Sequence, residues 1–286
     1  MSVLLVATGG TIASRPTDEG VRVVLSATEV LARCAAATGA DVSDVEAIEV
    51  AHGPSWSFDP DEPIDIARHA LGGAASHDGV VVTHGTDTLE ETLFLTWLLS
   101  NDGVDRGSIV FTGAMRHADH PESDGPRNLA DSLDVARYRT ATASGPVLCM
   151  SGGVHHARWV TKTDSSALDS FKSVDGSGNT SPPVVPADLA VETAISQVQS
   201  HTDADETEII GLLDRGARGL IVEGTGAGNV HRALVPGIER AIGDGIPVVI
   251  TTRCWTGSVA PDYGGVGGGR WLADRGAIPG GDLPSH

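Results

Sequence analysis

The stretch GVVVTHGTDTLEE, residues 79–91, decides the fold. Its Val80–Val82 run is apolar and β-branched, which predicts a strand buried on both faces. Thr88 and Glu91 have the spacing of a capping box, so a helix is expected to begin there. Thr86 and Asp87 would then lie at the carboxyl end of a parallel strand, beside a helix N-terminus. That is where open α/β sheets bind ligands.

A second unit of the same design opens the chain. Residues 3–14, VLLVATGGTIAS, run from an apolar strand through Thr8 and two glycines to Thr11. Taken singly, a threonine or aspartate before a helix is most often only a cap. Because the design occurs twice, we expect the hydroxyls of Thr11 and Thr86 to face one cleft.

These two stretches resemble the two signature motifs of the bacterial-type L-asparaginase family of amidohydrolases. Two long motifs in the right order are far more specific than one glycine-rich loop. Later segments are also similar to the family: TGAMR at 112–116, SDGPRNL at 123–129 and ARWVTKT at 157–163. The resemblance extends over nearly the whole chain.

The first half of the chain has the pattern of a large α/β domain. Strands are expected at 3–7, 45–51, 80–82, 108–112 and 146–149, and helices at 28–38, 61–71 and onward from Thr88. Residues 14–20 are polar and lack periodicity, which predicts a loop. We expect an N-terminal catalytic α/β domain over 1–176 with a mixed, mostly parallel sheet. A linker rich in Gly, Ser and Pro is expected at 177–189.

The remaining residues, 190–286, are expected to form a smaller, flavodoxin-like parallel α/β domain. Predicted strands at 191–198, 219–222 and 247–251 alternate with predicted helices at 206–216 and 230–243. The glycine-rich turn at 224–229 resembles a dinucleotide-binding turn. However, the next predicted strand does not end in the Asp or Glu that would bind the ribose of a dinucleotide. The glycine-rich stretch 264–283 is expected to be loop.

Bulk properties restrict the partners of the protein. The formal charge of −19 argues against nucleic acid and anionic membranes as partners, because phosphate binding needs clustered Lys and Arg. No run of 18 apolar residues occurs, and the chain enters a strand directly after Met1 and Ser2, so a cytoplasmic location is expected. Cys34, Cys149 and Cys254 are too few and too scattered for a disulfide framework or a metal site. We expect neither a metal nor a cofactor.

The family resemblance implies the catalytic residues. Thr11 is implied as the nucleophile that becomes acylated, and Thr86, Lys162 and Asp87 as a second triad of hydroxyl, amine and carboxylate. Which threonine attacks first stays open. His84 is implied to be structural; its use as a general base is the alternative.

The resemblance also implies how a small amino-acid substrate is held. Asp87 would bind the α-amino group, Ser55 the α-carboxylate, and the backbone carbonyl of Ala114 the substrate amide. Gly10 and Gly85 allow close backbone approach and direct N–H groups at an anion. A homotetramer built as a dimer of intimate dimers is implied, in which Asn229 of a neighbouring subunit completes each site.

The sequence departs from the family at three places. Trp56 stands where many members have glutamine, which replaces a polar substrate contact with an apolar wall. The 14–25 segment lacks the family's lid tyrosine. The acidic residue that a neighbouring subunit contributes in dual-specificity members aligns near Gly264 of this sequence, and Asp262 is the nearest carboxylate. Trp56 and Gly264 predict a strong preference for asparagine over glutamine.

The expected function is therefore hydrolysis of L-asparagine to L-aspartate and ammonia through a threonyl ester. Two alternatives stay open. One is an asparaginase-like amidohydrolase for another amide, such as the tRNA-linked glutamine handled by related archaeal amidotransferases. The acidic charge and the lack of an N-terminal tRNA-facing domain argue against it. The other is an amino-acid-binding protein without turnover.

Overall fold

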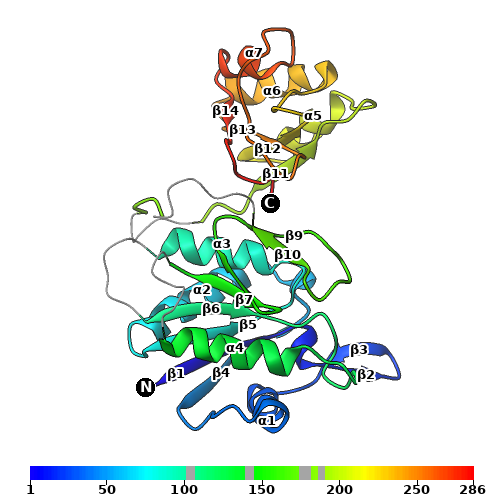
Figure 1. Cartoon of the computed structure of the whole chain (residues 1–286). Helices are drawn as coiled ribbons and strands as arrows, with labels where there is room; N and C mark the ends of the chain where they lie inside the picture. The colour runs from blue at the N-terminus through cyan, green and yellow to red at the C-terminus, as the bar shows by residue number, and fades with distance from the viewer. Residues whose placement is uncertain (101–106, 139–144, 174–181, 186–190) are drawn as a thin grey trace. The chain divides into compact units, whose positions relative to one another are not determined.

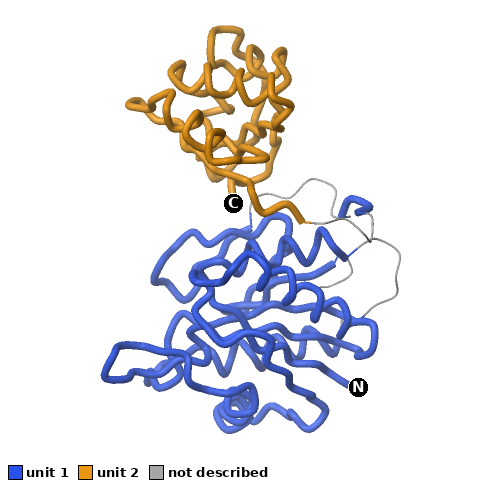
Figure 2. Tube along the Cα trace, turned by 180° about the vertical axis from the view of Figure 1, so that it is seen from behind, with its two compact units in different colours: residues 1–187 blue, residues 188–286 orange. Residues whose placement is uncertain are grey.

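The chain forms two compact units, residues 1–187 and 188–286 (Figures 1 and 2). The computed structural model describes residues 1–100, 107–138, 145–173, 182–185 and 191–286. The predicted linker, 177–189, lies outside the described residues apart from 182–185. Each unit is an α/β structure, as the sequence predicts.

A six-stranded sheet forms the centre of the first unit. In sheet order its strands are β4 (Val45–Gly53), β1 (Val3–Gly9), β5 (Gly79–Thr83), β6 (Ser108–Thr112), β7 (Val147–Met150) and β8 (Gly153–His156). Neighbouring strands are parallel except β7 and β8, which are antiparallel. The prediction of a mixed, mostly parallel sheet is confirmed.

Helices cover both faces of this sheet (Figure 1). They are α1 (Ala27–Thr38), α2 (Asp61–Ala74), α3 (Leu89–Leu99) and α4 (Gly125–Tyr138). Residues alternate along the strands: Leu5 and Val81 pack in one core cluster with α1 and α4, while Val6 and Val82 pack in a second cluster with α2 and α3. Burial on both faces explains why these strands are continuous apolar runs.

The expected loop at 14–20 is instead a β-hairpin. Strand β2 (Ser14–Thr17) pairs antiparallel with β3 (Gly20–Val23). The hydroxyl of Thr17 donates to the carbonyl oxygen of Gly20, and Gly20 adopts a φ of 102°, which favours glycine. The hairpin is largely exposed, so its residues lack the apolar alternation that would have predicted strands.

A separate two-stranded sheet completes the described elements of the first unit. It consists of β9 (Val160–Lys162) and β10 (Phe171–Ser173), which pair antiparallel. Two 3₁₀ turns follow strands of the large sheet, η1 (Thr11–Ala13) after β1 and η2 (Ser55–Ser57) after β4. They carry the chain away from the sheet edge where the polar motifs lie.

The second unit contains a four-stranded parallel sheet. Its strands, in sheet order, are β11 (Ile195–Gln199), β12 (Gly219–Gly224), β13 (Val248–Thr252) and β14 (Ile278–Pro279). The other elements are α5 (Thr207–Asp214), η3 (Arg232–Leu234), α6 (Val235–Gly243) and α7 (Gly269–Ala273). The predicted alternation of strand and helix is confirmed.

Two predictions in the second unit need correction. The strand expected at 191–198 begins only at Ile195. The stretch 264–283, expected to be loop, contains α7 and β14. Both elements are too short to show a periodic pattern, and buried contacts such as that of Leu272 with the core of this unit hold them in place.

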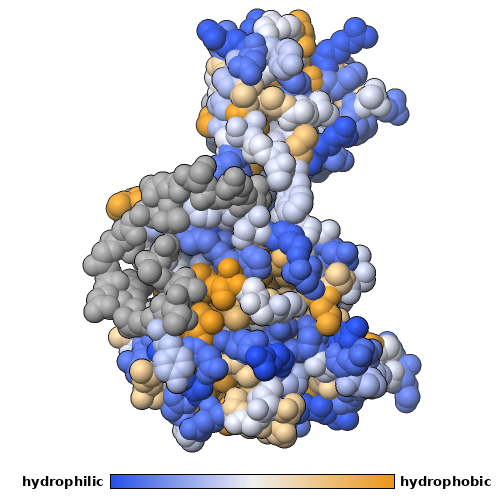
Figure 3. All heavy atoms as spheres, in the orientation of Figure 1, coloured by the Kyte–Doolittle hydropathy of each residue, from blue (hydrophilic) through white to orange (hydrophobic). Residues whose placement is uncertain are grey.

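The visible face of the molecule in Figure 3 is mainly hydrophilic, with small apolar patches. Such a surface agrees with the excess of 38 acidic over 19 basic side chains. Among the described residues, no helix combines the length and the apolar composition needed to cross a membrane.

Candidate active site

The two polar motifs meet at one edge of the large sheet. Strands β1 and β5 are parallel neighbours, with Ala7 paired to Thr83, so the residues after both strands leave the sheet side by side. Beside them is a cavity of about 500 Å³. Its lining comprises Gly10, Thr11, Ser14, Glu19, Val21, Arg22, Val23, Pro54, Ser55, Trp56, Gly85, Thr86 and Asp87.

Glycines permit the close approach of the two motifs. Gly10 has a φ of 76°, and a Cβ on it would lie 2.6 Å from the Cα of Gly85. A Cβ on Gly85 would in turn lie 2.6 Å from the Oγ of Ser55. The backbone N–H of Gly10 donates to the carbonyl oxygen of Gly53, which ties the end of β1 to the end of β4 (3.0 Å).

Lys162 joins the two polar residues after β5. Its Nζ donates to the Oγ1 of Thr86 (2.9 Å) and to the Oδ1 of Asp87 (2.6 Å). The Lys162 side chain is 14% exposed and that of Asp87 49% exposed, while Thr86 is buried. The ammonium is therefore largely removed from water, whereas the carboxylate faces the cavity in part.

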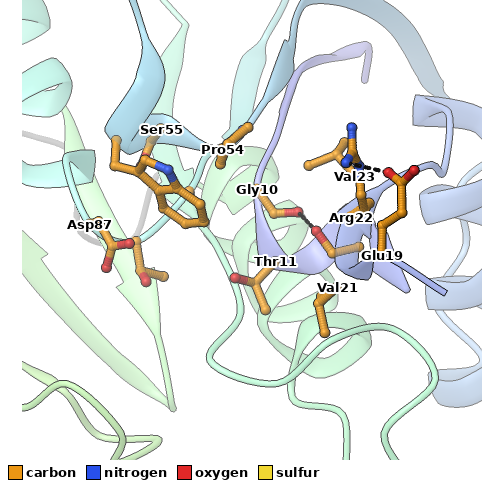
Figure 4. A pocket seen from close by; sticks show the side chains of 13 residues that line it. Gly10, Thr11, Glu19, Val21, Arg22, Val23, Pro54, Ser55 and Asp87 are labelled. Carbon is orange, nitrogen blue, oxygen red and sulfur yellow. Dashed lines mark hydrogen bonds and ion pairs between the residues drawn. The ribbon is translucent and has the colours of Figure 1, made fainter. Parts of the chain in front are cut away.

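Thr11 lies in η1, half-buried, and lines the same cavity. In Figure 4, Asp87 and Ser55 lie on one side of Thr11, and the β2–β3 residues Glu19, Val21 and Arg22 lie on the other. The hairpin thus forms one wall of the cavity.

The hairpin wall is charged, since Arg22 on β3 pairs with Glu19 in the turn (2.8 Å). Trp56, 71% exposed, also lines the cavity.

Ser55 is buried in η2 and is bound to the turn that opens α3. Its Oγ accepts from the backbone N–H of Thr88 (3.3 Å), and the hydroxyl of Thr88 donates to the Ser55 carbonyl oxygen (3.1 Å). The predicted Thr88–Glu91 capping box is therefore wrong: Thr88 precedes α3 but its side chain does not cap it. A hydrogen bond with a distant segment replaces the local one.

Ala114 follows β6, and its side chain is buried outside the lining of the cavity. Asp124 holds its turn: the carboxylate accepts from the N–H groups of Met115 and Arg116, both at 2.9 Å. Asn128 donates from Nδ2 to the carbonyl oxygen of Gly113 (3.0 Å). The Asp124 side chain therefore shapes the turn that carries Ala114.

His84 has the surroundings of a structural residue. It is fully buried, with its ring against Phe58 and Phe111, and its Nδ1–H donates to the Gly85 carbonyl oxygen (2.8 Å). Burial lowers the pKa of His84 from 6.5 to about 4. Its Nε2 has no hydrogen-bond partner among the described residues, and the ring does not line the cavity.

Asn229 lies in the second unit, at the end of the turn after β12. Its carbonyl oxygen accepts from the N–H of Thr225 (2.8 Å), and its Oδ1 accepts from the N–H of Gly269 (3.2 Å). Within its own unit, Asn229 therefore closes a turn and anchors the start of α7.

Sequence reasoning did not identify the hairpin residues that line the cavity, nor Glu90 beside Lys162. Glu90, in the first turn of α3, accepts the backbone N–H of Lys162 at its Oε2 (2.6 Å). The available signal was its spacing, since Glu90 is four residues after Thr86 at the opening of the same helix. In the described part of the chain, no three His, Cys, Asp or Glu side chains are grouped as metal ligands.

Comparison with known proteins agrees with this architecture. A family model described as Asparaginase, N-terminal matches residues 2–180, and one described as Glutaminase/Asparaginase C-terminal domain matches residues 194–286. The chain is 34% identical to a probable L-asparaginase of Deinococcus radiodurans, over 99% of this chain and 88% of that protein.

Two further matches are an amidotransferase subunit and a solved asparaginase structure. The chain is 30% identical to a glutamyl-tRNA(Gln) amidotransferase subunit of Aeropyrum pernix, over 99% of this chain and 72% of that protein. The solved structure of a probable cytoplasmic L-asparaginase from Campylobacter jejuni has a TM-score of 0.83 at 25% identity, covering 100% of this chain and 91% of that one. Both family models and the extent of these matches show that the chain belongs to the asparaginase family.

Proposed function

We propose that the protein hydrolyses L-asparagine to L-aspartate and ammonia. One observation carries the proposal: Lys162 Nζ contacts both Thr86 and Asp87 beside the cavity that Thr11 lines. A threonine hydroxyl attacks an amide only when a neighbouring group accepts its proton. The site offers two such hydroxyls, and the one on Thr86 contacts an amine that also contacts a carboxylate. Relatives named L-asparaginase add support.

The proposed reaction has two steps with a threonyl ester between them. The Oγ of Thr11 bonds to the side-chain carbonyl carbon of asparagine, the C–N bond breaks, and ammonia leaves with the hydroxyl proton. Water then attacks the ester carbon, Thr11 recovers a proton, and aspartate leaves. Thr86, with Lys162 at 2.9 Å, provides a relay for these proton transfers.

Charged groups at the cavity suit an amino-acid substrate. The Asp87 carboxylate, half exposed, binds the α-ammonium group. The Ser55 oxygen already accepts from Thr88, so its hydroxyl hydrogen is the group it offers to the α-carboxylate. The N–H of Gly10 is already donated to Gly53, so the backbone N–H of Gly85 is the proposed donor to the developing oxyanion. The Ala114 carbonyl is the proposed acceptor for the substrate amide.

A second candidate is hydrolysis of another amide. It is favoured by the 30% identity to the Aeropyrum pernix amidotransferase protein over almost the full chain. Against a tRNA-bound substrate stands the net charge of −19, which disfavours contact with phosphates. Asparagine is therefore the substrate we favour, with glutamine as the comparison.

For the whole molecule we propose a cytoplasmic homotetramer, a dimer of dimers, in which Asn229 of a neighbouring subunit completes each site. The cytoplasmic setting is supported by the relative from Campylobacter jejuni, which carries that description. The assembly follows from family resemblance.

Ammonia release from asparagine, glutamine and a blank tests the activity. We expect kcat/KM for asparagine to exceed that for glutamine by more than about tenfold. The shape of a pocket alone discriminates two substrates that differ by one methylene by only about 1–3 kcal/mol. The rest of the selectivity is expected because Trp56 and Gly264 remove polar contacts that the longer substrate needs. Comparable values for both substrates would contradict the proposed selectivity. Binding of asparagine without ammonia release would indicate a binding protein.

Variants test the proposed residues in the same assay. Thr11→Ala, Thr86→Ala and Lys162→Met should each lower kcat about 10³-fold or more, because such residues act as a unit. Lys172→Met is the matched control: it removes the other lysine of the chain, which pairs with Asp169. Near-wild-type turnover by either threonine variant would refute the two-threonine mechanism. Ser55→Ala should mainly raise KM.

A further inference from the structure

Lys162 contacts Thr86 and Asp87 from outside the large sheet. Thr86 and Asp87 follow a strand that is hydrogen-bonded to neighbours on both sides, β1 and β6. Lys162 is instead the last residue of β9, a three-residue strand paired only with β10 in the two-stranded sheet. Placement of its amine against Thr86 therefore requires a connection between this small sheet and the segment after β5.

Glu90 provides such a connection. Strands β9 and β10 lie beside α3 (Figure 1), and Glu90 is in the first turn of that helix. Its carboxylate Oε2 lies 2.6 Å from the backbone nitrogen of Lys162. Hydrogen bonds to a charged acceptor are short and roughly twice as strong as neutral ones. The N-terminal turn of a helix also favours a carboxylate.

Residues 86–90 thus hold Lys162 at two points. Thr86 and Asp87 contact its Nζ, and Glu90 contacts its backbone N–H. All three groups belong to one continuous turn and helix start, so the distance between the two points is set by one rigid element. Without the second point, the amine would be tied to Thr86 only through a flexible four-carbon side chain.

We propose that Glu90 is a positioning residue, which sets the backbone of Lys162 so that its amine meets Thr86. The inference rests on the proposed function of the site. In this role Glu90 acts on turnover through Lys162, and it does not line the cavity. Loss of its carboxylate should therefore lower kcat while leaving substrate affinity nearly unchanged.

Kinetics of three variants test this role. Glu90→Ala should lower kcat about 10- to 100-fold, the effect of a displacement of about 1 Å in a catalytic group, with KM within about threefold of wild type. Glu90→Gln keeps an oxygen that accepts the N–H, so it should recover most of the lost kcat. Glu91→Ala removes the same charge from the same helical turn and should stay near wild type.

Two kinetic outcomes would overturn the proposal. One is an unchanged kcat in Glu90→Ala. The other is an equal loss in Glu90→Ala and Glu91→Ala, which would assign the effect to charge at the helix terminus and not to the contact with Lys162.

The two lysines of the chain permit a test that does not need turnover. In protein labelled with ¹⁵N-lysine, only the amides of Lys162 and Lys172 give signals. Lys172 lies on β10, paired with Thr161, and reports on the small sheet itself. In Glu90→Ala, the Lys162 amide should shift and exchange faster with solvent, while the Lys172 amide stays in place.

Equal changes in both amides would show that the small sheet as a whole is disturbed, which would contradict a specific positioning role. No change in the Lys162 amide would refute the contact. If the wild-type protein releases no ammonia from asparagine, the proposed function fails, and the amide signals still decide whether Glu90 positions Lys162.

Discussion

Lys162 and His84 are two largely buried basic side chains whose different hydrogen-bond partners give them different roles. Lys162 is mostly buried but has two oxygen partners at its amine. His84 is two residues from Thr86 yet lies among aromatic rings, with one ring nitrogen bound to a carbonyl oxygen. Burial without a charged partner favours the neutral imidazole. The structure therefore supports a structural role for His84 and gives no geometry for a general base.

The burial of His84 predicts a pH-dependent stability. Its pKa is about 4 in the folded protein and 6.5 in the unfolded chain, so the unfolded chain binds more protons between these values. The free energy of unfolding should fall as the pH drops from about 6.5 towards 4. Between pH 7 and 4.5 this contribution is about 2 kcal/mol. Urea unfolding of wild type and His84→Leu at both pH values measures it.

The exposed His69 on α2 supplies the matched control. His69→Leu should lose stability with falling pH as wild type does, whereas His84→Leu should lose about 2 kcal/mol less. An equally steep loss in His84→Leu would show that other groups account for the acid sensitivity.

At the level of elements, the cavity depends on how closely the ends of β1 and β5 approach. Gly10 and Gly85 meet backbone to backbone, and the β2–β3 hairpin that follows η1 closes one side. Atoms of the backbone cannot move aside as the end of a flexible side chain can. The approach of the two threonine-bearing motifs is therefore sensitive to a single added methyl group.

Gly10→Ala should separate the two motifs. Its Cβ would lie 2.6 Å from both the Cα and the nitrogen of Gly85. Gly39→Ala is the matched control, because Gly39 has a φ of 75° against 76° for Gly10, but nothing lies within 4 Å of its Cβ position. The control should cost about 1–2 kcal/mol from backbone strain alone.

We expect Gly10→Ala to cost at least about 2 kcal/mol more than the control and to lower kcat/KM, whereas Gly39→Ala keeps wild-type kinetics. Thermal or urea unfolding with steady-state kinetics measures both effects. Equal losses in the free energy of unfolding of the two variants would contradict this expectation. They would show that the backbone near Gly10 accommodates the added methyl group without destabilising the fold.

At the scale of the whole molecule, the residues proposed for the active site are divided between the two units. In the first, Thr11, Thr86 and Asp87 line one cavity, and Lys162 contacts Thr86 and Asp87. The second holds Asn229, whose Oδ1 is engaged by Gly269 within that unit while the proposed assembly uses the residue at a neighbour's site. A site shared between subunits can be tested by combining defects in different chains.

Hybrid assemblies of Thr11→Ala and Asn229→Asp chains should regain activity. The aspartate keeps an acceptor for the Gly269 N–H but removes the Nδ2 donor. If a neighbour supplies Asn229, a hybrid dimer contains one site in which both residues are wild type.

The mass of the assembly is a separate test. Light scattering should give four times 29.4 kDa, about 118 kDa, for the closed tetramer. A fully active monomer, or hybrids no better than their parents, would contradict the shared site.

The sequence by itself determined the two α/β units and five of the six strands of the large sheet, because apolar runs with turn residues at their ends are local features. Strand β8, of sequence GVHH, has no such run and was not predicted. It also placed Thr11 and Thr86 together, since parallel strands bring their carboxyl ends to one edge. The identities of the catalytic residues came from resemblance, since spacing alone does not distinguish a catalytic threonine from a cap.

Only the tertiary structure decided which partner each polar group takes. The position of Lys162 depends on Glu90, 72 residues away, and on a sheet of two three-residue strands that have no periodic signal. Thr88 has the spacing of a cap but bonds to Ser55 instead. Long-range hydrogen bonds compete with local ones at similar energy, about 0.5–1.5 kcal/mol each, so packing and not sequence spacing selects between them.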